Sequence, residues 1–80
     1  MKWNKKVIEN KDIAALTVQL HTLCLQGNSA VENIRCVYKL KDTDFIYYES
    51  IFDWIDKYHE NIIDIDSIEN FTLYQPFNEN

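Results

Sequence analysis

Two hydrophobic periodicities follow one another within residues 34–62, and their order most constrains the fold. Over residues 34–40 apolar side chains recur at every second position, which is typical of a half-buried strand. The turn-forming residues 41–44 then precede the apolar run 45–48, which predicts the second arm of a hairpin. Residues 50–60 begin with a serine that is followed three positions later by an aspartate, as in a capping box. The apolar side chains of this segment then recur at helical spacing. We therefore expect a hairpin that leads into an amphipathic helix, whose inner face consists of Ile51, Phe52, Ile55, Tyr58 and Ile62.

The remaining segments supply three further elements. Residues 3–9 are short and compatible with a strand, so we expect them at a sheet edge. Residues 12–26 have apolar side chains at helical spacing before Gly27, and two adjacent alanines favour the helix over a strand, which stays the alternative. A last strand is expected over residues 69–75, ending at Pro76.

The expected chain order is β-α-β-β-α-β, the ferredoxin-like or split-βαβ arrangement. It belongs to the α+β class, with a small antiparallel sheet and two helices on one face. Without the first strand, the same pattern gives an open three-stranded sheet. The length of 80 residues suits one domain, residues 1–80, and we expect the tail 77–80 to fray. One glycine and one proline argue against a loop-rich scaffold.

Charge is unevenly distributed along the chain. Residues 1–41 hold seven basic and three acidic side chains, a net charge of +4, whereas residues 42–80 hold one basic and ten acidic side chains, a net charge of −9. The whole chain carries −5. A protein of this charge is repelled by the phosphates of free nucleic acid and attracted to a basic surface.

Carboxylates follow the predicted helix at helical spacing. Four of them fall at positions i, i+4, i+7 and i+11, so we expect them in one stripe opposite the apolar face. At ~1.5 Å per residue the stripe spans about 17 Å, with a charge spacing close to the ~3.4 Å between phosphates along one DNA strand. The alternative is a solvated helix face, although such faces normally mix both signs of charge. The stripe consists of Glu49, Asp53, Asp56 and Glu60, and Asp42 and Asp44 precede it in the turn.

Aromatic side chains are concentrated in the same part of the sequence. Six of them lie within residues 45–58, more than a core of this size is expected to bury. Tyrosine and tryptophan are enriched in the residues that dominate protein-binding energies. We therefore expect Tyr47 or Tyr48, together with Trp54, to be exposed beside the acids, with a purely structural two-layer core as the alternative.

The segment Asp44-Phe45-Ile46-Tyr47-Tyr48 resembles the Asp-Leu-Ile-Tyr-Tyr-Pro segment of the colicin DNase immunity proteins. These are small acidic inhibitors whose paired tyrosines and nearby acids dock on a basic nuclease. The resemblance covers these five residues, Glu49 stands in place of the proline, and the rest of the chain lacks the four-helix pattern of that family. It implies the same chemistry for the tyrosines and acids of this chain.

Catalytic and metal-binding patterns are weak in this sequence. His21 and Cys24 are three residues apart, but Cys36 and His59 are distant in sequence, so the paired spacing of a zinc site is missing. One glycine excludes a glycine-rich phosphate loop. Two cysteines fit a reducing compartment, with a single Cys24–Cys36 bridge as the alternative. We therefore expect no enzyme activity, no metal and no cofactor.

A group of basic residues supports a rival function. Sheet aromatics can stack the bases of single-stranded RNA, and cations lie on the first segment and on the strand at 34–40. That strand lacks the glycine-aromatic signature of RNA-recognition sheets, and the net charge opposes binding. These basic residues are Lys2, Lys5, Lys6, Lys11, Arg35, Lys39 and Lys41.

The sequence thus predicts a small acidic, non-enzymatic protein that binds and inhibits a basic nucleic-acid-handling protein as a nucleic-acid mimic. It is similar in size and charge to the anti-restriction and anti-CRISPR proteins of bacteriophages. The alternatives are an antitoxin or immunity protein, an RNA-binding domain and a homodimeric structural module. With no signal peptide or membrane segment in the sequence, we expect a cytoplasmic protein, in the host cytoplasm if it is viral. The expected partner-binding residues are Asp42, Asp44, Tyr47, Tyr48, Glu49, Asp53, Trp54, Asp56 and Glu60.

Overall fold

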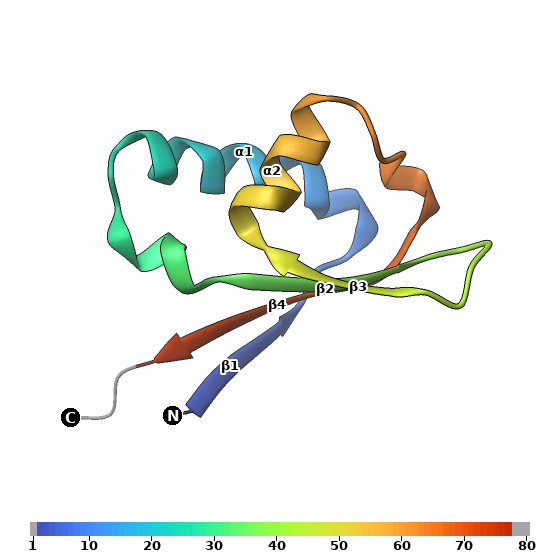
Figure 1. Ribbon diagram of the computed structural model, residues 1–80, viewed down its shortest axis with the longest axis horizontal. Coiled ribbons are helices and arrows are strands. Elements are labelled where there is room, and N and C mark those ends of the chain that lie inside the picture. Colours follow the sequence, from blue (N-terminus) through green and yellow to red (C-terminus); the bar gives the residue numbers. More distant parts are fainter. Residues whose placement is uncertain (1, 78–80) are drawn as a thin grey trace.

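Four strands form one antiparallel sheet, and two helices lie against one of its faces (Figure 1). The computed structural model describes the backbone of residues 2–77 and the side chains of residues 4–75. The predicted α+β class and chain order are confirmed. The elements are β1 (Lys2–Val7), α1 (Ile13–Leu25), β2 (Arg35–Leu40), β3 (Ile46–Ser50), α2 (Ile51–His59) and β4 (Ile68–Phe77), with short 3-10 helices η1 (Asn10–Asp12), η2 (Ser29–Asn33) and η3 (Ile65–Ser67).

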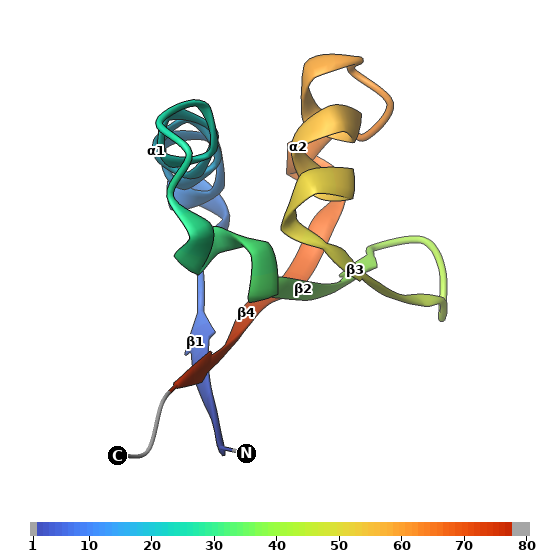
Figure 2. The same ribbon diagram turned by 60° about the vertical axis from the view of Figure 1, so that its left-hand side comes forward.

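The lateral order of the sheet is β1-β4-β2-β3. The helix α1 connects β1 and β2, which have β4 between them, and α2 connects β3 and β4, which have β2 between them. This is a split-βαβ arrangement. The strands β1 and β3 form the two edges of the sheet. Seen from the side, both helices stand on the same face of the sheet, and no helix of residues 2–77 lies on the opposite, open face (Figure 2).

The first helix ends in a glycine-dependent motif. Gly27 has a φ of 73°, a left-handed conformation that only glycine adopts at little cost. Its N–H donates to the Cys24 carbonyl at 3.0 Å, and the next N–H, of Asn28, donates to the Leu23 carbonyl at 3.1 Å. These two bonds form a Schellman motif. The helical interpretation of residues 12–26 is confirmed.

The strand β3 passes directly into α2. Ser50 ends the strand and caps the helix, because its Oγ accepts a hydrogen bond from the N–H of Asp53 at 3.2 Å. The predicted capping serine is confirmed. The helix begins only at Ile51, so Glu49 belongs to the strand.

Aromatic rings occupy the centre of the core. Trp54 is 1% exposed, and its ring centroid lies 4.9 Å from that of Phe71 and 5.2 Å from that of Tyr38. The prediction of which residues form the inner face of the helix α2 is partly wrong, because Phe52 and Ile62 are exposed. The buried side of α2 instead includes Trp54, three residues after Ile51, which is one helical turn along the same face.

The C-terminal strand is longer than expected. It continues through Pro76 to Phe77, whose backbone pairs with Lys2 of β1. The strand β2 pairs with β4 only as far as Tyr74, so Pro76 has a neighbouring strand, β1, on one side alone. A proline is tolerated there because its missing N–H interrupts no pairing with β2. Of the predicted frayed tail, Phe77 lies in β4, and residues 78–80 lie outside the described residues. Within residues 2–77, no helix combines the length and hydrophobicity needed to cross a membrane.

Candidate protein-binding surface

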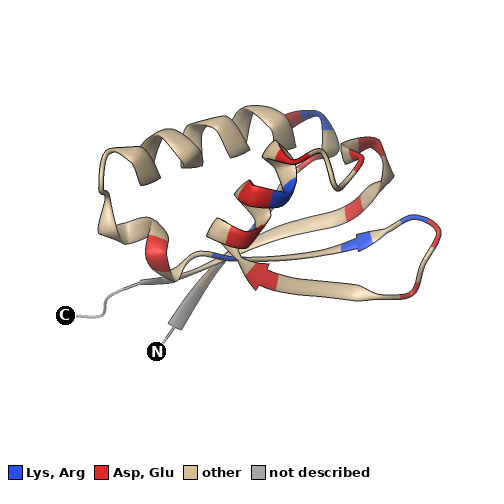
Figure 3. Ribbon diagram, turned by 45° about the horizontal axis from the view of Figure 1, so that its top comes forward, with Lys and Arg blue, Asp and Glu red and all other residues tan. Residues whose placement is uncertain are grey.

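Three exposed carboxylates lie on α2 and at its C-terminal end, those of Asp53, Asp56 and the C-cap residue Glu60. Figure 3 shows the acidic positions of this segment in red. They are spaced by three and four residues, so they follow one another along one side of the helix. None of them takes part in an ion pair between described residues. Asp42 and Asp44 are also exposed, in the turn between β2 and β3. Five of the six predicted carboxylates are therefore available to a partner.

The sixth carboxylate, Glu49, is structural. It lies on the helix-facing side of β3, opposite Cys36 in the register, and its side chain is only 11% exposed. One of its oxygens accepts a hydrogen bond from the Tyr38 hydroxyl at 3.0 Å, and the other forms an ion pair with Lys57. The prediction that Glu49 belongs to the helical stripe is wrong, because β3 continues through Ser50 before the helix begins.

The two adjacent tyrosines point to opposite faces of the sheet, as neighbours on a strand must. Tyr47 lies on the helix side, where its ring stacks on Tyr38 at a centroid distance of 5.1 Å and Lys57 Nζ lies 5.3 Å from its centroid. Tyr48 lies on the open side and is 65% exposed. Only Tyr48 presents most of its ring to a partner.

Trp54 cannot contact a partner. Its indole N–H donates to Thr17 Oγ1 of α1 at 2.9 Å, inside the core. The prediction that Trp54 is an exposed binding residue is wrong. The physical reason is that the two-layer core needs a large side chain between α1, α2 and the sheet, and an indole fills that space while its N–H finds an acceptor.

The buried titratable groups are kept neutral. Burial, together with the negative charge of Glu49, raises the pKa of the Cys36 thiol to about 12. Burial also raises the pKa of the Tyr38 hydroxyl well above its usual range, together with the charge and hydrogen bond of Glu49. Burial raises the pKa of Cys24 as well. Both cysteines are free thiols, and these shifts oppose formation of a reactive thiolate.

One contact between the helices was not predicted. His21 Nδ1 of α1 and His59 Nε2 of α2 lie 3.0 Å apart, although 38 positions separate the residues. No local sequence signal indicates such a contact, because it depends on how the helices pack. Within the described part of the chain, no group of three or more His, Cys, Asp or Glu residues could hold a metal ion.

Sequence reasoning also missed an exposed apolar strip. Phe45, Ile46 and Tyr48 are all among the exposed large hydrophobic residues, and they lie on β3 or directly before it. The apolar run 45–48 was visible in the sequence, but the edge position of β3 was not. Large apolar side chains that stay exposed together often mark an interaction site.

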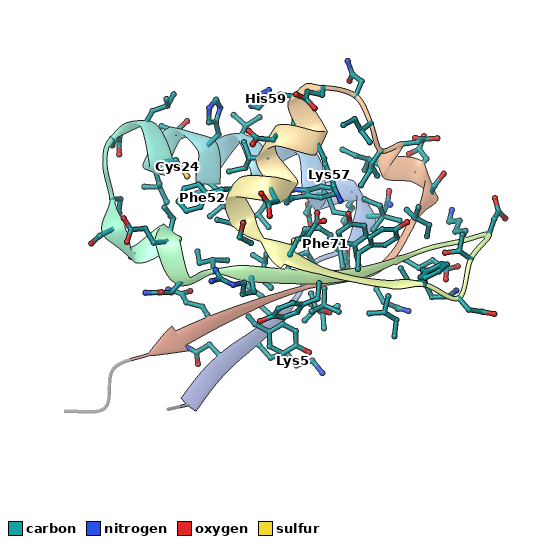
Figure 4. The ribbon with its side chains drawn as sticks, in the orientation of Figure 1. Lys5, Cys24, Phe52, Lys57, His59 and Phe71 are labelled. Atoms are coloured by element: carbon teal, nitrogen blue, oxygen red, sulfur yellow. The ribbon has the colours of Figure 1, made fainter. Side chains whose placement is uncertain are left out.

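The open face of the sheet carries most of the basic residues of the strands. Lys5 projects from this face, away from the helices (Figure 4). Lys39 forms an ion pair with Glu69 at 3.1 Å. Arg35 donates to the carbonyl oxygens of Glu32 and Ile34, both at 3.1 Å, and so folds back on its own chain. Two of these three cations are therefore already engaged.

Comparison with known proteins gives no match to a family model, to a curated protein or to a solved structure. Five exposed carboxylates, two before β3 in the turn and three after it on α2 and at its C-terminal end, flank the strand β3 in sequence. The exposed apolar side chains Ile46 and Tyr48 of β3 lie on the open face of the sheet.

Proposed function

We propose that this protein is a non-enzymatic inhibitor that binds a basic nucleic-acid-handling protein through its acidic surface. The observation that carries the proposal is the exposure of Asp53, Asp56 and Glu60 on one side of α2, with no ion-pair partner among the described residues. Asp42 and Asp44 extend the same negative surface along the hairpin turn. A basic groove that binds phosphates offers the complementary charge.

The dimensions of the helix fit a short stretch of nucleic-acid backbone. From Asp53 to Glu60 the helix axis advances by about 10 Å at ~1.5 Å per residue. At ~3.4 Å between successive phosphates, about four phosphates of one DNA strand span the same axial length. The carboxylates thus support mimicry of a few phosphates, and the turn acids supply further charges nearby. Two free thiols fit a cytoplasmic site of action.

A second candidate function is supported by the open sheet face. Lys5, Arg35 and Tyr74 occupy one register row across three strands, so cations and an aromatic ring are neighbours on an uncovered surface. Single-stranded RNA is bound by surfaces of this kind. We rank this function second, because Arg35 and Lys39 are engaged with carbonyls and Glu69, and because the net charge is −5.

The proposal is tested by capture and displacement. The tagged full-length protein is incubated with a cell lysate, and captured proteins are identified after elution in rising salt. We expect a basic nucleic-acid-binding protein that elutes early in the gradient, because added salt weakens contacts between exposed charges. The purified partner should then release a labelled nucleic acid when this protein is added. A partner that binds both together, or a captured set without basic proteins, would contradict the proposal.

A further inference from the structure

The outer edge of β3 has unpaired main-chain groups. β3 is the last strand of the sheet and, within residues 2–77, pairs only with β2. The Ile51 N–H, just after the strand, donates to the Ile34 carbonyl at 3.1 Å and so points toward β2. Main-chain groups alternate in direction along an antiparallel strand. The N–H and C=O groups of Ile46 and Tyr48 therefore point outward, away from β2.

This edge lacks three of the features that commonly prevent strand pairing, and its one charged residue, Glu49, is paired with Lys57. Soluble proteins protect edge strands with lysine, proline or a bulge. The sequence of β3, Ile46-Tyr47-Tyr48-Glu49-Ser50, has no lysine or proline, and its pairing with β2 shows no register shift. Its open-side residues, Ile46 and Tyr48, are exposed apolar side chains. The strand is thus both geometrically and chemically suited to accept another strand.

The charges around the edge indicate what that strand contains. Asp42 and Asp44 lie just before β3, and Asp53 and Asp56 lie just after it on α2. On the open face of the sheet, the exposed side chains at this edge are those of Ile46 and Tyr48. The edge is therefore apolar on its open face, whereas the acids of α2 lie on the helical side. We propose that β3 binds an extended segment of the partner as a fifth strand, with basic residues on the helix side alternating with apolar residues on the open side. This inference rests on the proposed function, because it specifies how the acidic surface holds its partner.

A second copy of the chain is a poor occupant of the same edge. In an antiparallel pairing of two β3 strands, the turn acids Asp42 and Asp44 of one copy would lie beside Asp53 and Asp56 of the other. In a parallel pairing, each acid would lie beside its own counterpart. Both arrangements bring like charges together, which is unfavourable. Charge complementarity therefore favours a basic segment from another protein.

The test uses three synthetic octapeptides and the full-length protein labelled with nitrogen-15. The first peptide alternates lysine with valine, the second alternates glutamate with valine, and the third alternates lysine with proline. The third has the charge of the first but cannot form a strand ladder, because proline lacks the N–H. Hydrogen exchange of the Ile46 and Tyr48 amides is followed by NMR at saturating peptide. We expect the lysine–valine peptide alone to slow exchange of both amides, by about ten-fold or more.

Matched variants locate the binding site. Tyr48→Lys places a positive charge on the proposed binding edge. Val7→Lys is the control, because Val7 is equally exposed, at 66% against 65% for Tyr48, and lies in the same register row on the opposite edge, β1. We expect Tyr48→Lys to weaken binding of the lysine–valine peptide by about ten-fold, and Val7→Lys to leave it within about two-fold.

The outcomes separate this inference from the proposed function. If both lysine peptides shift only α2 resonances such as those of Asp53 and Asp56, the edge inference is wrong while the acidic surface still binds. If the lysine–valine peptide does not bind at all, the edge inference is wrong, and the capture experiment decides the proposed function separately. If the Ile46 and Tyr48 amides become protected with rising protein concentration alone, a second copy occupies the edge and the inference is overturned.

Discussion

At the scale of single residues, Thr17 joins the two helices through one hydroxyl group. Its Oγ1 donates to the Ile13 carbonyl at 2.7 Å within α1 and accepts the Trp54 indole N–H at 2.9 Å from α2. Both Thr17 and Trp54 are 1% exposed, so water cannot replace either bond. A buried N–H group without a hydrogen-bond acceptor destabilises the folded state by the full cost of removing that group from water.

Replacement of this hydroxyl should therefore be costly although the shape is kept. We expect Thr17→Val to lower the free energy of unfolding by about 1–3 kcal/mol, because it leaves the indole N–H without an acceptor. Thr22→Val is the matched control, since Thr22 makes the same type of bond to the Val18 carbonyl, at 3.0 Å, but is exposed. Its expected effect is within about 0.5 kcal/mol. Urea unfolding followed by tryptophan fluorescence measures both, and equal effects would contradict this role of Thr17.

The Cys36 thiol makes stability depend on alkaline pH. Its pKa is raised in the folded state, from 9.0 to about 12, so the folded protein keeps the proton while the unfolded chain loses it. The stabilising effect of the neutral thiol is therefore complete below pH 9 and is lost as the pH rises toward 12. The raised pKa of Tyr38 acts in the same direction at higher pH.

We expect the stability difference between the wild type and Cys36→Ala to shrink as pH rises. The wild type should lose up to about 1.4 kcal/mol per pH unit above pH 9 from this thiol, and the variant lacks that loss. All other side chains are the same in both proteins, so the difference isolates Cys36. Urea unfolding at about pH 8 and about pH 10.5 provides the measurement. A difference that stays constant with pH would show that the thiol titrates equally in both states.

At the scale of elements, the junction of β3 and α2 decides which carboxylates face solvent. Glu49 is the last residue but one of β3 and points between the layers, whereas Asp56 is on the outer side of α2. The two residues lie seven positions apart and carry the same charge. Their roles differ because one belongs to a strand and the other to a helix.

Neutralising each carboxylate should separate these roles. We expect Glu49→Gln to lower the free energy of unfolding by about 1–3 kcal/mol, because it leaves the partly buried Lys57 without its counter-charge. Asp56→Asn should change it by less than about 0.5 kcal/mol. Conversely, affinity for the captured partner should fall for Asp56→Asn and stay unchanged for Glu49→Gln. Unfolding in urea and binding of the folded variants give the two readouts, and a reversed pattern would contradict the assignment.

Element types could be predicted from the sequence, but element boundaries and neighbours could not. Periodicity predicted the hairpin, both helices and the capping serine, since these depend on local spacing. The position of Glu49 depends on where the strand ends, and one residue changes the direction of a side chain. The burial of Trp54 and the His21–His59 contact depend on packing between segments 37 and 38 residues apart. The exposed carboxylates of α2 were predictable because they lie on one helix face.

At the scale of the whole molecule, charge is separated between the two faces. The unpaired carboxylates of α2 lie on the helical side, and Lys5 lies on the open side of the sheet. Lys57, the only lysine or arginine of α2, is paired with Glu49. The negative charge on the helical side thus has little local compensation, whereas on the open side Glu69 compensates Lys39 and the positive charges of Lys5 and Arg35 remain.

This separation predicts that the protein does not bind free nucleic acid. The domain measures 42 × 26 × 19 Å, and its two shorter dimensions are about three Debye lengths or less at physiological salt, so the thirteen Asp and Glu side chains of the chain oppose any phosphate near the open face. We expect no mobility shift of single- or double-stranded nucleic acid at micromolar protein and about 0.15 M salt. A micromolar RNA complex that weakens steeply with salt, and that Lys5→Glu abolishes, would instead establish the open face as the binding site.

The central claim is that the acidic side of α2 binds a basic partner, and charge reversal tests it most directly. The double variant Asp53→Lys/Asp56→Lys is compared with Asp12→Lys/Glu32→Lys, which makes the same change in net charge at two exposed positions outside α2. Equilibrium affinity for the captured partner is measured for both after urea unfolding has shown that they fold. The account predicts a loss of ten-fold or more, on the order of 1.4 kcal/mol, for the α2 variant and a clearly smaller loss for the control. Unchanged affinity of the α2 variant, or an equal loss in both, would contradict it.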